Sequence, residues 1–127
     1  MNLNMLKCKI HRATVTEADL NYTGSIGIDA DLMKASGIIE NEQVDVYNIT
    51  NGERFTTYAI KKAGGSGAIE INGAAAHLAK KGHEVIIAAY VSMSEAEAKV
   101  HKPEIVFVDK KNRVQGSGIR VKGSGVR

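Results

Sequence analysis

The sequence has one cysteine, one proline and no tryptophan among its 127 residues. The single Cys8 excludes a disulfide within the chain and is typical of a reducing compartment. No apolar run is long enough to span a bilayer, and residues 1–4 lack the basic and then apolar order of a secretory signal. We therefore expect a cytoplasmic protein with one folded domain, because a chain of this length supplies a single core.

Acidic residues are absent from residues 110–127, which carry six of the 17 basic side chains. Residues 1–109 therefore hold 11 basic and 14 acidic residues, a net charge of −3, although the whole chain has +3. The excess positive charge belongs to one end of the chain and not to a basic face of the fold. With four Tyr and two Phe, the sequence also lacks an aromatic platform for bases, so we expect no nucleic-acid partner.

The same C-terminal stretch changes composition and contains two Gly-Ser-Gly units. Glycine and serine in this proportion are typical of flexible chain. We therefore predict one folded domain over residues 1–109. Residues 110–127 are predicted to be a flexible basic tail, either a natural terminus or an added extension.

Short alternating or apolar runs dominate the remaining sequence. Leu6, Cys8 and Ile10 alternate with polar residues, which predicts a strand with one buried face. The Asn-Gly pair at positions 51 and 52 is a strong hairpin signal between two such runs. The glycine-rich residues 64–67 are interpreted as another hairpin turn. Further strands are predicted over residues 44–49, 54–61, 68–71, 85–91 and 105–108.

Three short helices are predicted between these strands. The first begins after Asp29 as N-cap and ends at Gly37, and the second covers residues 74–79. The third begins at Ser94, where Glu97 completes a capping box. Many short strands with a few short helices favour a small, mostly β barrel or sandwich.

Several familiar site patterns are incomplete. Cys8 and His11 lie three positions apart on a predicted strand and so on opposite faces, which leaves Cys8 as a core residue. The four histidines show no paired ligand spacing, and we expect no metal site. Residues 64–67 precede a strand and lack the Gly-Lys-Ser/Thr of a phosphate loop.

A more specific pattern is spread over four segments. They read Lys9-Ile10-His11-Arg12, Tyr22-Thr23-Gly24-Ser25, Asn51-Gly52-Glu53-Arg54-Phe55-Thr56-Thr57-Tyr58 and Asn72-Gly73-Ala74-Ala75-Ala76. In this order and at these spacings, the set closely resembles the pyruvoyl-dependent aspartate 1-decarboxylases of pantothenate synthesis. The resemblance covers residues 5–109. It implies a six-stranded double-psi β-barrel with a few short helices, assembled as a homotetramer with active sites between subunits.

The resemblance also implies a zymogen that cleaves itself. The Ser25 hydroxyl would attack the carbonyl carbon of Gly24, whose backbone freedom and missing side chain suit this approach. Elimination would then separate chains 1–24 and 25–127 and leave a pyruvoyl group in place of Ser25. This group would form a Schiff base with L-aspartate and accept electrons as carbon dioxide leaves, so neither pyridoxal phosphate nor a metal is expected. An accessory maturation factor is a further candidate partner.

The site residues have distinct expected roles. Arg54 has a planar guanidinium that can bind the carboxylate that aspartate retains. Tyr58 shares its strand face and is the candidate proton donor, because no His or Cys is well placed for that step. Thr57 is implied in processing and substrate binding, but strand alternation puts it on the other face, which requires a bulge or a site shared between subunits. The resemblance also implicates Lys9, Asn72, Gly73, Ala74 and Ala75 in substrate binding, with His11 and Tyr22 as second-tier candidates.

Two other interpretations stay open. The chain could keep the fold and remain an unprocessed, silent precursor, or it could be a small barrel that binds a partner without chemistry. The mass of the purified protein distinguishes them from the enzyme, because only self-cleavage produces two fragments.

Overall fold

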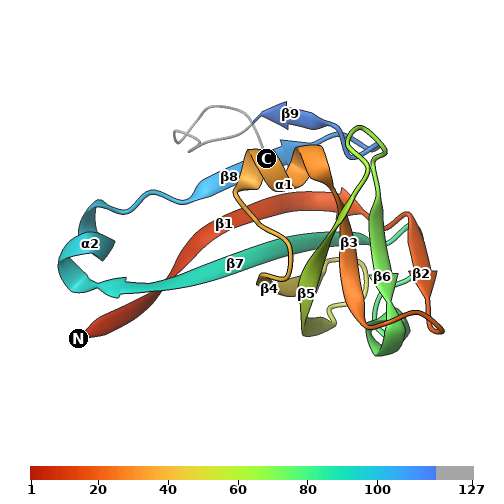
Figure 1. Ribbon diagram of the computed structural model, residues 1–127, viewed down its shortest axis with the longest axis horizontal. Helices are drawn as coiled ribbons and strands as arrows, with labels where there is room; N and C mark the ends of the chain where they lie inside the picture. The colour runs from red at the N-terminus through yellow and green to blue at the C-terminus, as the bar shows by residue number, and fades with distance from the viewer. Residues whose placement is uncertain (117–127) are drawn as a thin grey trace.

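The first predicted strand is the longest element of the fold. The computed structural model describes residues 1–116 (Figure 1), and β1 covers Asn2–Thr14. Cys8 and Ile10 are fully buried, whereas Lys7, Lys9 and His11 between and beside them are partly exposed. The alternation in the sequence therefore places one face of β1 in the core, as predicted.

All nine strands of residues 1–116 belong to one sheet, in the order β2-β6-β3-β5-β4-β7-β1-β8-β9. The predicted hairpin at Asn51-Gly52 joins β4 and β5 in antiparallel register. The mostly β class with a few short helices is confirmed. The strands after β1 are β2 (Glu17–Asp19), β3 (Ser25–Asp29), β4 (Gln43–Asn48), β5 (Arg54–Lys62), β6 (Ile69–Asn72), β7 (Glu84–Ser94), β8 (Glu104–Val108) and β9 (Val114–Gly116).

The strand order requires the sheet to curl. β2 is first and β1 is seventh in the order, so a flat sheet would hold them about 29 Å apart at about 4.8 Å per strand. Only Val15 and Thr16 link β1 to β2, and this link spans about 11 Å at most. The Thr16 N–H donates to the Ile69 carbonyl of β6 at 2.8 Å. The sheet therefore closes as a barrel around a core that includes Ile10, Ile26, Ile28, Val46, Ile71, Ile87 and Val106.

The two α-helices begin where their caps predict. Helix α1 (Ala30–Ser36) is capped by Asp29, and Gly37 ends it in a left-handed conformation. Helix α2 (Glu95–Val100) begins after Ser94, and Glu97 completes the capping box. The predicted helix over residues 74–79 is instead a short 3-10 helix, η1 (Gly73–His77). Asn72 does not cap η1 with its side chain, which contacts Ser25 instead.

Two strands and one turn differ from the prediction. β2 and β3 were not expected, because they are only three and five residues long. The hairpin expected at residues 64–67 is wrong, because β3 lies between β5 and β6 in the sheet. The loop instead crosses the end of β3, where its Gly65 and Gly67 N–H groups donate to the Asp29 carboxylate at 3.1 and 2.8 Å.

The folded part of the chain extends beyond the predicted boundary at residue 109. Asn112 is buried and donates to the carbonyls of Thr14 and Gly67, both at 2.8 Å. β9 pairs with β8 in the stretch that was predicted as tail. The rest of the predicted tail, residues 117–127, lies outside the described residues. None of the helices in residues 1–116 is long and apolar enough to cross a membrane.

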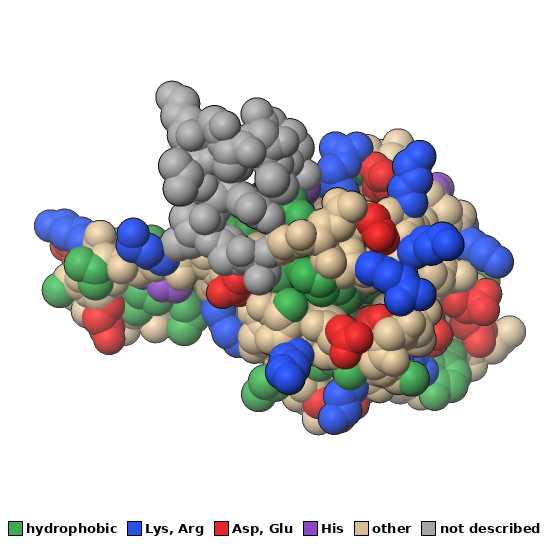
Figure 2. All heavy atoms as spheres, turned by 90° about the horizontal axis from the view of Figure 1, so that it is seen from above, with side chains coloured by type: hydrophobic (Ala, Val, Ile, Leu, Met, Phe, Trp, Pro, Cys, Tyr) green, Lys and Arg blue, Asp and Glu red, His purple; other side chains and the backbone are tan. Residues whose placement is uncertain are grey.

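One part of the structure extends away from the barrel. It consists of the beginning of β1, the end of β7 and helix α2 (Figure 1). Apolar side chains are visible on its surface (Figure 2), and Met1 and Val100 are 97% and 77% exposed. We call this part the arm.

Candidate functional site

Ser25 is a buried polar residue at the first position of β3. It is 2% exposed, and its Oγ accepts a hydrogen bond from Nδ2 of Asn72 at 3.2 Å. The same hydroxyl donates to the Thr23 carbonyl at 3.3 Å. Asn72 reaches Ser25 because the antiparallel pairing of β3 and β6 places the two residues opposite each other. The hydroxyl is thereby held beside the peptide bond that joins residues 24 and 25.

Gly73 packs closely against the segment before Ser25. Its φ of +69° lies in the left-handed region that favours glycine. A Cβ at this position would lie 2.6 Å from the Cα of Gly24 and 3.1 Å from the Tyr22 carbonyl oxygen. Both the backbone conformation and the close contact therefore require glycine. Ala74 and Ala75 follow in η1, so these predicted site residues lie beside Ser25 as one cluster.

The neighbouring strand β5 brings Tyr58 and Thr57 to the same end of β3. Ile26 pairs with Ala59 in parallel register, so the preceding residues, Ser25 and Tyr58, lie at adjacent positions. The pairing of β4 and β5 is continuous from Tyr58 to Arg54, and Thr57 lies opposite the buried Val44. β5 therefore has no bulge that would turn Thr57 toward the face of Tyr58. The structure therefore does not contain the bulge that was one of the two explanations for Thr57.

A hollow of about 250 Å³ lies beside this cluster. Asn72 and Tyr22 line it together with Glu17, Asp19, Lys62 and Glu70. The Lys62 side chain crosses Gly27, where a Cβ would be 2.7 Å from its Cε, and its Nζ reaches Glu70 at 3.3 Å. Nζ also lies 5.7 Å from the centre of the Tyr22 ring. Asn72, whose amide contacts Ser25, is thus also one of the residues that line this hollow.

Lys9 and His11 lie on another part of the barrel. Both are on β1, and strands β5, β4 and β7 separate β1 from β3. The His11 ring packs edge-on against Phe107 at 5.6 Å, and its Nδ1 is buried without a hydrogen-bond partner in residues 1–116. Burial, together with the positive charges of Lys9 and Arg12, lowers the pKa of His11 below its usual value. Within residues 1–116, the hydrogen bonds of the Ser25 hydroxyl go to Thr23 and Asn72 and not to Lys9 or His11.

Arg54 is exposed at the beginning of β5, four residues from Tyr58. Four residues of an extended strand span about 13 Å, which separates the two side chains along a common face. The guanidinium carbon of Arg54 lies 4.3 Å from the centre of the Tyr47 ring. The Tyr47 hydroxyl is in turn 2.8 Å from the hydroxyl of Tyr90 on β7.

Tyr47 contacts Arg54, Tyr90 contacts Tyr47, and neither tyrosine was predicted from the sequence as part of the site. A signal for Tyr47 was present, because counting outward from the hairpin at Asn51-Gly52 pairs Tyr47 with Arg54. No comparable signal pointed to Tyr90, which comes from a strand more than 40 positions away in the sequence.

Cys8 is fully buried and is not a reactive thiol. Burial raises its pKa to about 11, so the nucleophilic thiolate is disfavoured at neutral pH. The prediction that Cys8 is a core residue is confirmed.

Comparison with known proteins identifies close relatives. Residues 1–115 match the aspartate decarboxylase family. The chain is similar to proteins named aspartate 1-decarboxylase from Maricaulis maris, Caldicellulosiruptor saccharolyticus and Bordetella avium. The first two are 58% and 60% identical over 114 residues, covering 90% of this chain and 94% and 89% of theirs. The Bordetella avium protein is 59% identical over 111 residues, covering 87% of this chain and 91% of its own.

Proposed function

The chain belongs to the aspartate decarboxylase family, and from this premise we propose that it converts L-aspartate to β-alanine and carbon dioxide. We further propose that the enzyme makes its own pyruvoyl group from Ser25. The β-alanine would serve pantothenate synthesis. The observation that carries the proposal is the buried Ser25 hydroxyl, held between Asn72 and the Thr23 carbonyl beside Gly24, against whose backbone Gly73 packs closely.

Self-cleavage begins with the Ser25 hydroxyl. Its oxygen attacks the carbonyl carbon of Gly24, the hydroxyl proton passes to the departing amide nitrogen, and an ester replaces the peptide bond. Loss of the Ser25 α-proton then expels the Gly24 carboxylate and leaves dehydroalanine at position 25. Addition of water and loss of ammonia convert this residue to the pyruvoyl group. The products are chains 1–24 and 25–127.

The surroundings of Ser25 fit such a group. The three-carbon pyruvoyl unit occupies the space of the serine residue from which it forms, and the Asn72 amide that donates to Oγ can donate to an oxygen there. Gly73 leaves no side chain between this position and the segment before it. When present, the group supplies an electron sink for the decarboxylation of a bound amino acid.

The remaining tasks belong to side chains of the chain itself. Arg54 presents a planar fork of N–H donors that suits the carboxylate that aspartate retains. Lys9 adds a second positive charge for the dicarboxylate substrate. Tyr58, at the position adjacent to Ser25, is the candidate donor of the proton that takes the place of carbon dioxide. Thr57 is the candidate assistant in self-cleavage.

We infer that the working enzyme is a homotetramer whose sites form between subunits. Lys9 on β1 and Ser25 on β3 belong to strands that are not neighbours in the sheet, which supports a site that takes Lys9 from a second copy. The exposed apolar side chains of the arm support the same inference, because such surfaces commonly mark subunit contacts.

The direct test is the intact mass of the purified protein and of the Ser25→Ala variant. We expect the wild type to give two fragments, 1–24 and 25–127. The larger one should be lighter by one ammonia than simple hydrolysis would produce. Ser25→Ala lacks the attacking oxygen and should stay a single chain that forms no β-alanine from aspartate.

Each outcome separates the interpretations. Cleavage of Ser25→Ala at the same bond would exclude Ser25 as the nucleophile. A wild-type protein that remains one intact chain would favour the silent precursor. Two fragments without β-alanine formation would leave self-processing in place but reject the decarboxylase activity.

A further inference from the structure

Arg54 is exposed, yet its guanidinium is placed over an aromatic ring. The guanidinium carbon lies 4.3 Å from the centre of the Tyr47 ring, well within the range of a cation–π contact. No acidic side chain in residues 1–116 forms an ion pair with Arg54. Because the ring occupies the flat face of the guanidinium, the N–H donors at its edge stay available for a carboxylate.

The Tyr47 ring is itself held through its hydroxyl. That hydroxyl shares a 2.8 Å hydrogen bond with the Tyr90 hydroxyl and lies 3.5 Å from Oδ2 of Asp45. The other oxygen of Asp45 accepts a hydrogen bond from the Thr56 hydroxyl at 2.7 Å. Burial and the bond with Tyr90 raise the pKa of Tyr47 to about 12, so its hydroxyl keeps its proton at neutral pH.

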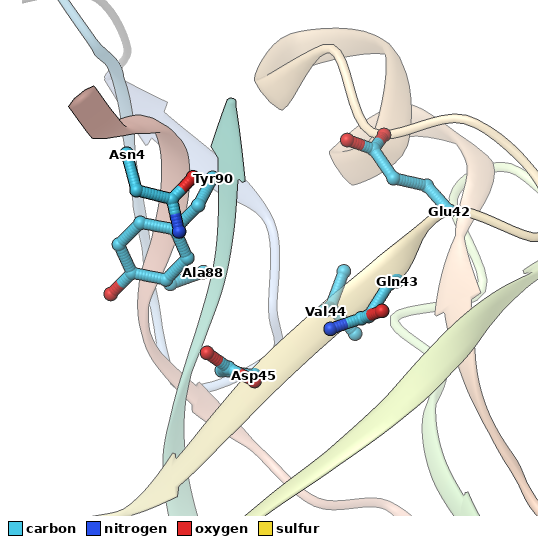
Figure 3. A pocket seen from close by; sticks show the side chains of 7 residues that line it. All are labelled: Asn4, Glu42, Gln43, Val44, Asp45, Ala88 and Tyr90. Carbon is cyan, nitrogen blue, oxygen red and sulfur yellow. The ribbon is translucent and has the colours of Figure 1, made fainter. Parts of the chain in front are cut away.

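The Tyr90 side chain is only partly enclosed by the fold. Tyr90 is 40% exposed and borders a hollow of about 290 Å³ between β4 and β7. In Figure 3, Tyr90 and Asn4 lie together on one side of this hollow, with Asp45 and Gln43 of β4 on the other. The hydrogen bond between the two hydroxyls links the Tyr90 ring to the Tyr47 ring.

We propose that Tyr47 and Tyr90 are positioning residues that hold the Arg54 guanidinium ready for the carboxylate that the substrate retains. The inference rests on the proposed function, in which Arg54 binds that carboxylate. Tyr90 orients Tyr47 through the hydroxyl pair, and Tyr47 orients Arg54 through its ring. Strands β7, β4 and β5 thereby each contribute one residue to the arrangement that presents the Arg54 guanidinium.

The physical reason is conformational freedom. An exposed arginine samples many rotamers, and a ligand that binds it must order the side chain. A guanidinium already stacked on a fixed ring has lost much of this freedom before the ligand arrives, so binding is stronger for the same contacts. Removing the support should therefore weaken substrate binding and leave the chemical step largely unchanged.

The test uses the full-length protein with Tyr90→Phe and Tyr47→Phe, each of which removes one hydroxyl and keeps the ring. After cleavage is confirmed by mass, kcat and KM are measured for L-aspartate. We expect either variant to raise KM about three- to tenfold, the effect of one lost hydrogen bond, with kcat within about twofold. Ser66→Ala removes a hydroxyl from the 64–67 loop and should leave both constants unchanged.

A second measurement asks whether Tyr90 acts through Arg54. Tyr90→Phe is introduced into an Arg54→Lys background, where the planar group that stacks on Tyr47 is gone. We expect Tyr90→Phe to change KM by less than about twofold there, because two residues that act on one contact are not additive. A purely structural role would produce the same fold-change in both backgrounds.

The outcomes separate the inference from the function on which it rests. If Arg54→Lys raises KM but Tyr90→Phe and Tyr47→Phe do not, the positioning role is wrong and the decarboxylase function stands. The positioning role is also wrong if Tyr90→Phe raises KM by the same factor in the wild-type and Arg54→Lys backgrounds. A wild-type protein that forms no β-alanine overturns both. If Tyr90→Phe fails to fold, Tyr47→Phe supplies the same readout.

Discussion

Tyr58 occupies a position in the barrel that no other tyrosine shares. It lies at the residue adjacent to Ser25 across the β3–β5 pairing, whereas Tyr47 and Tyr90 bond to each other on β4 and β7. Cys8 is buried with a raised pKa. In the sheet order, three strands lie between β3 and β1, the strand that carries His11. We therefore propose Tyr58 as the donor of the proton to the substrate carbon.

Replacing Tyr58 tests this assignment. Tyr58→Phe removes only the hydroxyl, so folding and cleavage before residue 25 should survive. Turnover should fall about 10²- to 10⁴-fold, the usual effect of losing a general acid. β-Alanine formation is followed after complete cleavage has been verified by mass. Turnover close to that of the wild type would assign the proton donor to another group, with a bound water as the next candidate.

At the scale of the elements, Asp29 holds together the end of β3, the beginning of α1 and the 64–67 loop. Its carboxylate accepts the N–H of Asp31 at 2.8 Å as the α1 cap, and it also accepts the N–H groups of Gly65 and Gly67. A buried carboxylate with three backbone donors joins a strand end, a helix start and a crossing loop. We expect this junction to contribute strongly to stability.

Asp29→Ala removes the helix cap and leaves two loop N–H groups without their acceptor. The free energy of unfolding should fall by about 2–4 kcal/mol. Urea unfolding at one protein concentration measures this, in the Ser25→Ala background so that every chain is intact. Asp31→Ala is the matched control, because Asp31 is exposed in the same turn and should change stability by about 0.5 kcal/mol or less. Equal losses for the two variants would contradict the role of Asp29.

At the scale of the whole molecule, the residues of the proposed site lie on strands that are not all neighbours in the sheet. Ser25, Asn72 and Gly73 form one cluster, and Lys9 lies beyond three intervening strands. If neighbouring subunits supply these two parts, each site contains Ser25 from one chain and Lys9 from another.

Co-expression of two inactive variants tests this division. Ser25→Ala lacks the nucleophile and Lys9→Ala lacks the second positive charge, so each should be strongly impaired alone. A random mixture should regain about a quarter of the wild-type activity, because about one site in four then combines an intact Ser25 with an intact Lys9. No recovery in verified mixed oligomers would place both residues in a site within one chain.

Local patterns in the sequence were sufficient for much of the fold. The alternation around Cys8 predicts the buried face of β1, and Asn51-Gly52 predicts the β4–β5 hairpin. Ser94 and Glu97 predict the beginning of α2. These features depend on residues close together in the chain, so a short window contains the interactions that produce them. The Ser25 and Arg54 motifs likewise indicate the family from the sequence alone.

Only the tertiary structure decided which of these elements meet. β3 is only five residues long, and its place between β5 and β6 changes the 64–67 turn into a crossing loop. The Tyr90–Tyr47–Arg54 chain and the separation of Lys9 from Ser25 also depend on the strand order. That order follows from closing a barrel around one core, which couples residues distant in the sequence and leaves no local signal.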